Sequence, residues 1–81
     1  MLMPDKHIRF SQSILGFGSY LLGNMSSPVS VDVLWQQYQK DLKGDLYVAH
    51  FSFDSFLLTI VFLFTIDAIR ESEEGILERC G

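Results

Sequence analysis

The chain has 81 residues, 48% of them hydrophobic, and carries 6 Lys and Arg against 10 Asp and Glu, which gives a net charge of -4. This length fits a single domain, residues 1–81, and leaves no room for a second. The acidic balance argues against a domain that binds nucleic acid by itself, because such domains gather an excess of basic residues on one face. The high apolar content of so small a chain indicates that part of its surface meets another protein.

Cysteine usage and the N-terminal sequence bear on location. The one cysteine, Cys80, excludes a disulfide framework and is typical of an intracellular protein. The N-terminal residues lack the basic start, long apolar stretch and cleavage site of a secretory signal. The most apolar stretch, residues 56–66, is shorter than the roughly 20 residues of a membrane-spanning helix. We therefore expect a cytoplasmic location, and a small membrane-associated peptide is the alternative.

The first predicted helix covers about residues 10–24, where apolar residues recur at helical spacing and Ser11 or Ser13 can serve as N-cap. Gly16, Gly18 and Gly23 lie inside it. Each glycine costs roughly 1 kcal/mol relative to alanine within a helix, so their presence indicates the close approach of another backbone.

The second predicted helix follows Pro28, with Ser30 as N-cap and Asp32 near the positive end of the helix dipole. Apolar residues recur at i, i+3, i+4, i+7 and i+11, which is the pattern of an amphipathic helix. They are Val31, Leu34, Trp35, Tyr38 and Leu42. The sequence Lys-Gly-Asp at residues 43–45 ends this helix.

The third helix is predicted over residues 53–65, after an irregular connection, with Ser52 as N-cap. Asp67 follows as a turn residue, because aspartate tolerates left-handed backbone better than most residues. Residues 68–71 and 76–79 are predicted as two short strands around a turn at residues 72–75 that contains a glycine.

The order of these elements predicts the fold class. Three helices precede a hairpin, and the Pro-Val-Ser segment at residues 28–30 can add a third strand. This order predicts a mainly helical α+β fold, a winged helix-turn-helix in which the C-terminal β-hairpin forms the wing. A bare three-helix bundle with a disordered tail is the alternative fold.

The third helix is the informative one, because in a helix-turn-helix protein it enters the DNA major groove. At 100° per residue one side of this helix is suited to the core. That side carries Phe53, Phe56, Leu57, Ile60, Leu63 and Phe64. The opposite stripe carries Asp54, Leu58, Val61, Phe62 and Thr65.

The opposite stripe lacks the Lys, Arg, Asn and Gln side chains that make bidentate contacts with bases, and Asp54 would repel phosphate. Three large apolar groups instead form a patch of the kind that marks protein contacts. An alternative is that this helix is central and covered on both sides by its own chain, although 81 residues offer little material for a second cover.

Few residues are candidates for catalysis or for binding a metal or cofactor. His50 and Asp54 are four residues apart, as a catalytic His-carboxylate pair could be, but no nucleophile accompanies them, and capping around Ser52 explains them better. His7, His50 and Cys80 match no metal-ligand spacing. The Gly-Phe-Gly sequence at residues 16–18 lacks the third glycine and preceding strand of a dinucleotide site. We expect no catalytic residue, cofactor or metal.

Several short segments together resemble a known family. They are residues 4–11 (PDKHIRFS), 15–20 (LGFGSY), 34–35 (LW), 38–39 (YQ) and 50–54 (HFSFD). These segments resemble the small middle components of bacterial ABC-three-component systems. Such operons pair an ATPase of the structural-maintenance-of-chromosomes (SMC) type with a middle component of winged-helix character and an effector, often a nuclease, as in the Lamassu anti-phage systems.

The resemblance implies a non-catalytic subunit that joins the SMC-like ATPase to the effector and helps to keep the effector inactive until foreign DNA engages the ATPase. It implies that DNA is contacted mainly through the complex, and it supplies no catalytic residues. The implied binding role falls on residues 4–10 and 51–62. The candidate interface residues are Ile8, Phe10, Asp54, Leu58, Val61 and Phe62.

Two other functions remain open, a small membrane-associated peptide and a DNA-binding transcriptional regulator. A DNA-binding transcriptional regulator would need a basic surface, which dimerisation could create only by gathering Lys6, Arg9, Lys40 and Lys43. In the family that the chain resembles, the turn before the wing follows a more glycine-like pattern, and the departure from it at Asp67 leaves the geometry of the wing open.

Overall fold

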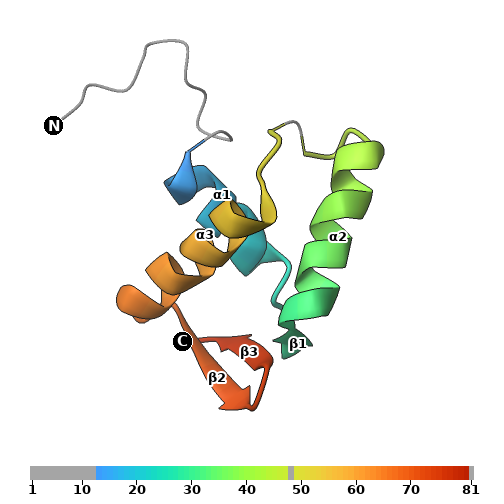
Figure 1. Ribbon diagram of the computed structural model, residues 1–81. Helices are drawn as coiled ribbons and strands as arrows, with labels where there is room; N and C mark the ends of the chain where they lie inside the picture. The colour runs from blue at the N-terminus through green and yellow to red at the C-terminus, as the bar shows by residue number, and fades with distance from the viewer. Residues whose placement is uncertain (1–12, 48, 81) are drawn as a thin grey trace, which may run out of the picture.

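Three helices and a small antiparallel sheet make up the computed structural model, which describes residues 13–47 and 49–80 (Figure 1). In chain order the elements are α1 (Ile14–Gly23), β1 (Val29–Ser30), α2 (Val31–Lys43), α3 (Phe53–Thr65), β2 (Ile69–Glu73) and β3 (Ile76–Arg79). This arrangement is that of a small winged-helix-like fold, mainly helical and of the α+β class, as predicted.

A serine hydroxyl sets the start of each helix by accepting a backbone N–H of the first turn. Ser13 accepts from Gly16 at 2.9 Å, and Ser30 and Ser52 cap α2 and α3 in the same way. The bounds predicted for the third helix are confirmed. The first helix is shorter than predicted, because its cap is Ser13 and the helix begins at the next residue instead of at residue 10.

The sheet has the strand order β1-β3-β2, with both pairs antiparallel, so the third strand predicted from residues 28–30 is confirmed. Val29 lies opposite Leu77 on β3. Strand β2 runs two residues beyond its predicted end, with an irregularity between Glu71 and Glu73. The turn is correspondingly tight, and Gly75 occupies it with a φ of 78°, where a side chain would be strained.

Two aspartates hold the left-handed backbone at the ends of α2 and α3. Asp67 has a φ of 60°, which confirms the prediction for the turn before the wing. Asp45 has the same φ after α2, whereas Gly44 keeps a negative φ of -89°. The chain therefore reverses after both helices at a residue type that tolerates this conformation.

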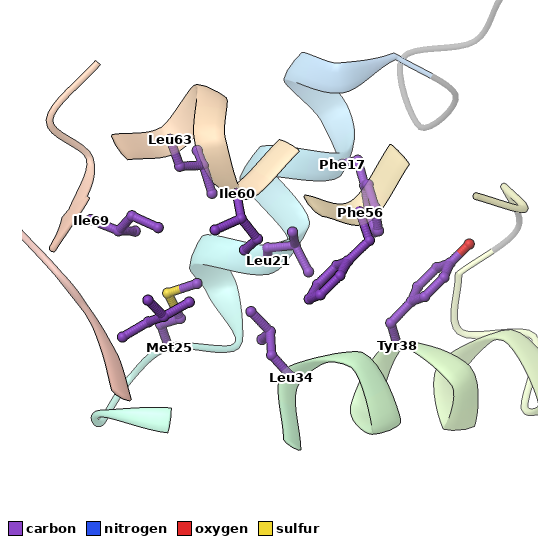
Figure 2. Close-up of a cluster of buried hydrophobic side chains, with 10 residues drawn as sticks. Phe17, Leu21, Met25, Leu34, Tyr38, Phe56, Ile60, Leu63 and Ile69 are labelled. Atoms are coloured by element: carbon purple, nitrogen blue, oxygen red, sulfur yellow. The ribbon is translucent and has the colours of Figure 1, made fainter. Parts of the chain in front are cut away.

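The core lies where the three helices and the sheet converge (Figure 2). Phe17 of α1 is fully buried in it and stacks on Phe51, with ring centroids 4.2 Å apart and planes at 2°. The other members of this buried cluster are Leu21, Met25, Leu34, Tyr38, Phe56, Ile60, Leu63, Ile69 and Leu77. Every helix and both strands of the hairpin contribute to it, so the wing is packed against the helices at its base.

The glycines of α1 behave differently from one another. A Cβ added to Gly18 would lie 3.2 Å from Leu63 Cδ2 and 3.7 Å from Thr59 Cγ2, so this glycine lets α3 approach closely. The tight packing predicted for this helix is therefore present at Gly18, where the nearest atoms of α3 belong to side chains and not to the backbone. A Cβ on Gly23 would meet nothing within 4 Å, so the expectation of tight packing there is wrong.

Candidate protein-interaction surface

The orientation of α3 differs from the prediction. Its buried residues are Phe56, Thr59, Ile60 and Leu63. Three residues assigned to the core are instead exposed, namely Phe53 at 42%, Leu57 at 38% and Phe64 at 37% of their surfaces. The helix is thus turned about its axis relative to the predicted orientation.

The contact with α1 explains this rotation. Gly18 leaves a gap on α1 that Leu63 and Thr59 of α3 fill. Thr59 can be fully buried because its hydroxyl donates to the carbonyl oxygen of Ser55 at 2.8 Å, which satisfies the polar group within the helix. Burying the Thr59 side of the helix turns Leu57 toward the exterior.

We define the apolar arc as the five exposed large apolar residues of α3. They are Phe53, Leu57, Leu58, Val61 and Phe64. At 100° per residue they fall within about 140° of the helix circumference. The arc adds to the apolar face that α3 already buries in the core. Together they are wider than the single apolar stripe that a core-facing helix requires.

The predicted interface residues lie in different environments in the structure. Leu58 and Val61 are 60% and 57% exposed, and Asp54 is exposed on the same side of the helix. Phe62 is only partly exposed and packs against the core cluster, so its placement on an open surface is wrong. Ile8 and Phe10 lie outside the described residues.

Sequence reasoning missed Phe53, Leu57 and Phe64 as surface residues. A signal was present in the composition of α3, because this helix has large apolar residues around most of its circumference and no Lys or Arg. A helix of this composition is either buried on all sides or exposes apolar surface.

The charges around the apolar arc are acidic. Asp54 lies in the first turn of α3, Asp67 lies just after the helix, and the last turn carries no basic residue. The wing contains two arginines. The charge of one of them, Arg70, is compensated by Glu78 at 2.6 Å. The surface formed by α3 and the wing therefore repels phosphate and favours cationic neighbours.

A polar cluster fixes α2 against α1 on the other side of the core. The Tyr20 hydroxyl donates a hydrogen bond to Asp41 Oδ2, and Gln37 Nε2 donates to Asp41 Oδ1 at 3.0 Å. Burial, together with this hydrogen bond to the carboxylate, raises the pKa of Tyr20 above its ordinary value. The Asp41 carboxylate is buried and has both oxygens bonded, which identifies it as a structural group.

Tyr38 connects α2 to the segment before α3. Its hydroxyl donates to the Ala49 carbonyl oxygen and accepts the Phe51 N–H, both at 2.7 Å. The ring is fully buried, so these two bonds satisfy a polar group inside the core. Burial raises the pKa of Tyr38 above its ordinary value.

The candidates for catalysis are not brought together. Within residues 13–47 and 49–80 no hydrogen bond joins His50 to Asp54, and Ser52 caps α3 as predicted. A hollow of about 490 Å³ is lined by Ser26, Ser27 and four other residues, none of them histidine. Cys80 is exposed, and its backbone N–H donates to the Ala68 carbonyl oxygen at 2.9 Å.

The described part of the chain offers neither a metal site nor a membrane span. No group of three or more His, Cys, Asp or Glu side chains that could hold a metal ion was found there. Nor does any helix in that part have the length and apolarity to cross a membrane.

The fold and this surface define a winged-helix-like domain whose third helix presents apolar and acidic groups where a DNA-reading protein presents polar and basic ones. The chain belongs to the family of middle component 6 of ABC-three component (ABC-3C) systems, whose family model matches residues 3–80. No curated protein and no solved structure matched the chain. The resemblance to middle components of these systems is thereby confirmed, and membership implies a multi-component complex.

Proposed function

We propose that this chain is a non-catalytic adaptor subunit of a bacterial anti-phage defence complex of the Lamassu kind. In this proposal residues 1–81 form one winged-helix domain that joins an SMC-like ATPase to an effector, such as a nuclease. The adaptor keeps the effector inactive until foreign DNA engages the ATPase. The membership of the chain in a middle-component family supports its role as an adaptor subunit.

The exposed apolar arc of α3 is the observation that carries the proposal. Five large apolar side chains on one helix leave a surface that a free monomer rarely exposes to water. Leu58 and Val61 make no contribution to the buried cluster, so the core does not account for their apolar character. Docking of a partner protein on α3 accounts for it.

The same surface argues against the transcriptional regulator. The bidentate base contacts of a DNA-reading helix come from Arg, Lys, Asn or Gln on its outer side. The outer side of α3 instead carries the apolar arc and Asp54. DNA in this system is therefore assigned to the ATPase, and the middle component is assigned to protein contacts.

The test is co-purification of the complex from its operon. The chain, carrying an affinity tag, is co-expressed with the ATPase and effector encoded beside it. We expect both to co-purify with the unchanged chain, and we expect the double variant L58E/V61E to lose at least one of them. Phe62 is left unchanged because it packs on the core.

A control is Val33→Glu, which places one glutamate, against the two of L58E/V61E, on the exposed side of α2. Circular dichroism of each isolated variant checks that its helices persist. The proposal fails if the unchanged chain purifies as a monomer without partners, or if L58E/V61E retains both partners as well as V33E does.

A further inference from the structure

The apolar arc has the dimensions of a helix-binding site. Helix α3 has 13 residues and is therefore roughly 20 Å long. The members of the arc recur from Phe53 through Leu57 and Val61 to Phe64, so apolar surface follows the helix axis over three turns. A continuous ridge of this kind packs against a second helix whose own apolar side chains fill its grooves.

The charge around the arc specifies the rim of that second helix. Residues 53–80, which form α3 and the wing, contain six acidic and two basic side chains. Asp54 and Asp67 lie at the two ends of α3, both exposed, and the helix itself contains no Lys or Arg. Basic side chains on a partner would therefore meet complementary charge at each end of the apolar contact.

We propose that the apolar arc binds an amphipathic helix of a partner protein whose apolar stripe is bordered by Lys or Arg. The inference rests on the proposed function and adds the chemistry of the partner to it. The apolar stripe supplies the binding energy, and the basic border supplies the rate and the choice of partner.

Other occupants fit the charges less well. A second copy of the chain docked through the same arc would bring two copies of Asp54 and Asp67 into one interface, where like charges repel. Duplex DNA would offer phosphates to an acidic surface. The chain's own residues 1–12 include Lys6 and Arg9, but the sequence also contains Pro4, and the spacing of its apolar residues is not the pattern of an amphipathic helix.

Three synthetic peptides of about 14 residues, long enough to match α3, test the proposal by fluorescence anisotropy with the full chain. One has a leucine stripe bordered by lysines, the second has glutamates in place of the lysines, and the third is a scrambled form of the first. We expect the lysine-bordered peptide to bind about tenfold more tightly than either of the others. Val61→Glu should abolish this binding.

The charge contribution is tested with D54N/D67N. Asparagine keeps the size of each side chain and tolerates the left-handed backbone at Asp67. We expect affinity for the lysine-bordered peptide to fall roughly two- to fivefold in about 0.05 M salt. The difference from the unchanged chain should largely vanish in about 0.5 M salt.

Four results would overturn the inference. They are equal binding of the lysine and glutamate peptides, equal binding of the scrambled peptide, a dimer of the chain that V61E dissociates, and peptide binding that appears only after I8E/F10E frees the arc from the chain's own N-terminal residues. If any of these occurs while L58E/V61E still disrupts the operon complex, the proposed function stands and only the partner chemistry is wrong. If L58E/V61E leaves that complex intact, the proposed function fails on its own test.

Discussion

Helices α2 and α3 have the same length and similar beginnings but opposite exteriors. Each has 13 residues, a serine N-cap and an aspartate in the first turn. The exposed side of α2 carries polar and charged residues such as Gln36, Gln39 and Lys40, with Val33 as its one exposed large apolar residue. The exposed side of α3 carries the five residues of the apolar arc.

This difference separates the demands of folding from those of function. Both helices bury one apolar face, and that requirement alone explains the sequence of α2, whose other face is suited to water. It does not explain α3, where a second apolar face remains after the core is complete. The surplus on α3 marks the side of the domain on which a partner is expected.

The buried faces of α2 and α3 should contribute equally to stability. Substitutions there should have the largest effects on the free energy of unfolding. Leu34 of α2 and Leu63 of α3 are both 1% exposed in the same cluster. Each change to alanine leaves a cavity and should lower the free energy of unfolding by about 2–5 kcal/mol. Urea denaturation of L34A and L63A measures both values. A loss well below 1 kcal/mol for L63A alone would mean that α3 is held only by its partner.

The contacts that α1 makes with these two helices should respond differently to pH. The side facing α2 contains the hydrogen bond from Tyr20 to Asp41, whereas the side facing α3 is the close contact at Gly18. The raised pKa of Tyr20 means that the folded chain holds this proton more tightly than the unfolded chain. Stability should therefore fall as the pH rises above about 10, the ordinary value for tyrosine.

The variant Tyr20→Phe tests whether Tyr20 causes this loss of stability at high pH. It removes the hydroxyl and should lower stability near neutral pH by about 1–3 kcal/mol, because Asp41 loses a donor while Gln37 still donates. Its decline above pH 10 should be shallower than that of the unchanged chain, although Tyr38 and Tyr47, whose pKa values are also raised, retain part of it. Thermal unfolding of both chains between about pH 8 and 11 compares the slopes. Parallel slopes would remove Tyr20 as the source.

The same two helices show what sequence could predict. Serine caps and apolar spacing are local signals, and they gave the start of α2 at Ser30 and both bounds of α3. The apolar inner face of α2 was also predictable, because most of its polar residues mark the opposite side. Asp41 is the exception, since it is buried and accepts the hydrogen bond of Tyr20. Helix α3 has no such polar side, so its sequence left the rotation about its axis undetermined.

What remained unpredictable depends on residues distant in sequence. The burial of Thr59 follows from Gly18, about 40 residues earlier on another helix. The bond between Tyr20 and Asp41 spans 21 residues and follows no local pattern. For the candidate site, Leu58 and Val61 were correctly predicted to be exposed, while Phe62 was misplaced and Leu57 was missed for the same reason, the rotation of α3.

Substitutions on the exposed faces of α2 and α3 should have the smallest effect on stability. They also compare the two helices most directly. Val33 and Val61 are 52% and 57% exposed, so V33S and V61S remove the same groups from equally open sites on α2 and α3. Each should change the free energy of unfolding of the isolated chain by no more than about 0.5 kcal/mol. In the operon complex the two variants should diverge, because only Val61 lies on the apolar arc. A loss of stability for isolated V61S as large as that for L63A would mean that the arc is part of the core, and the contrast between the two helices would then disappear.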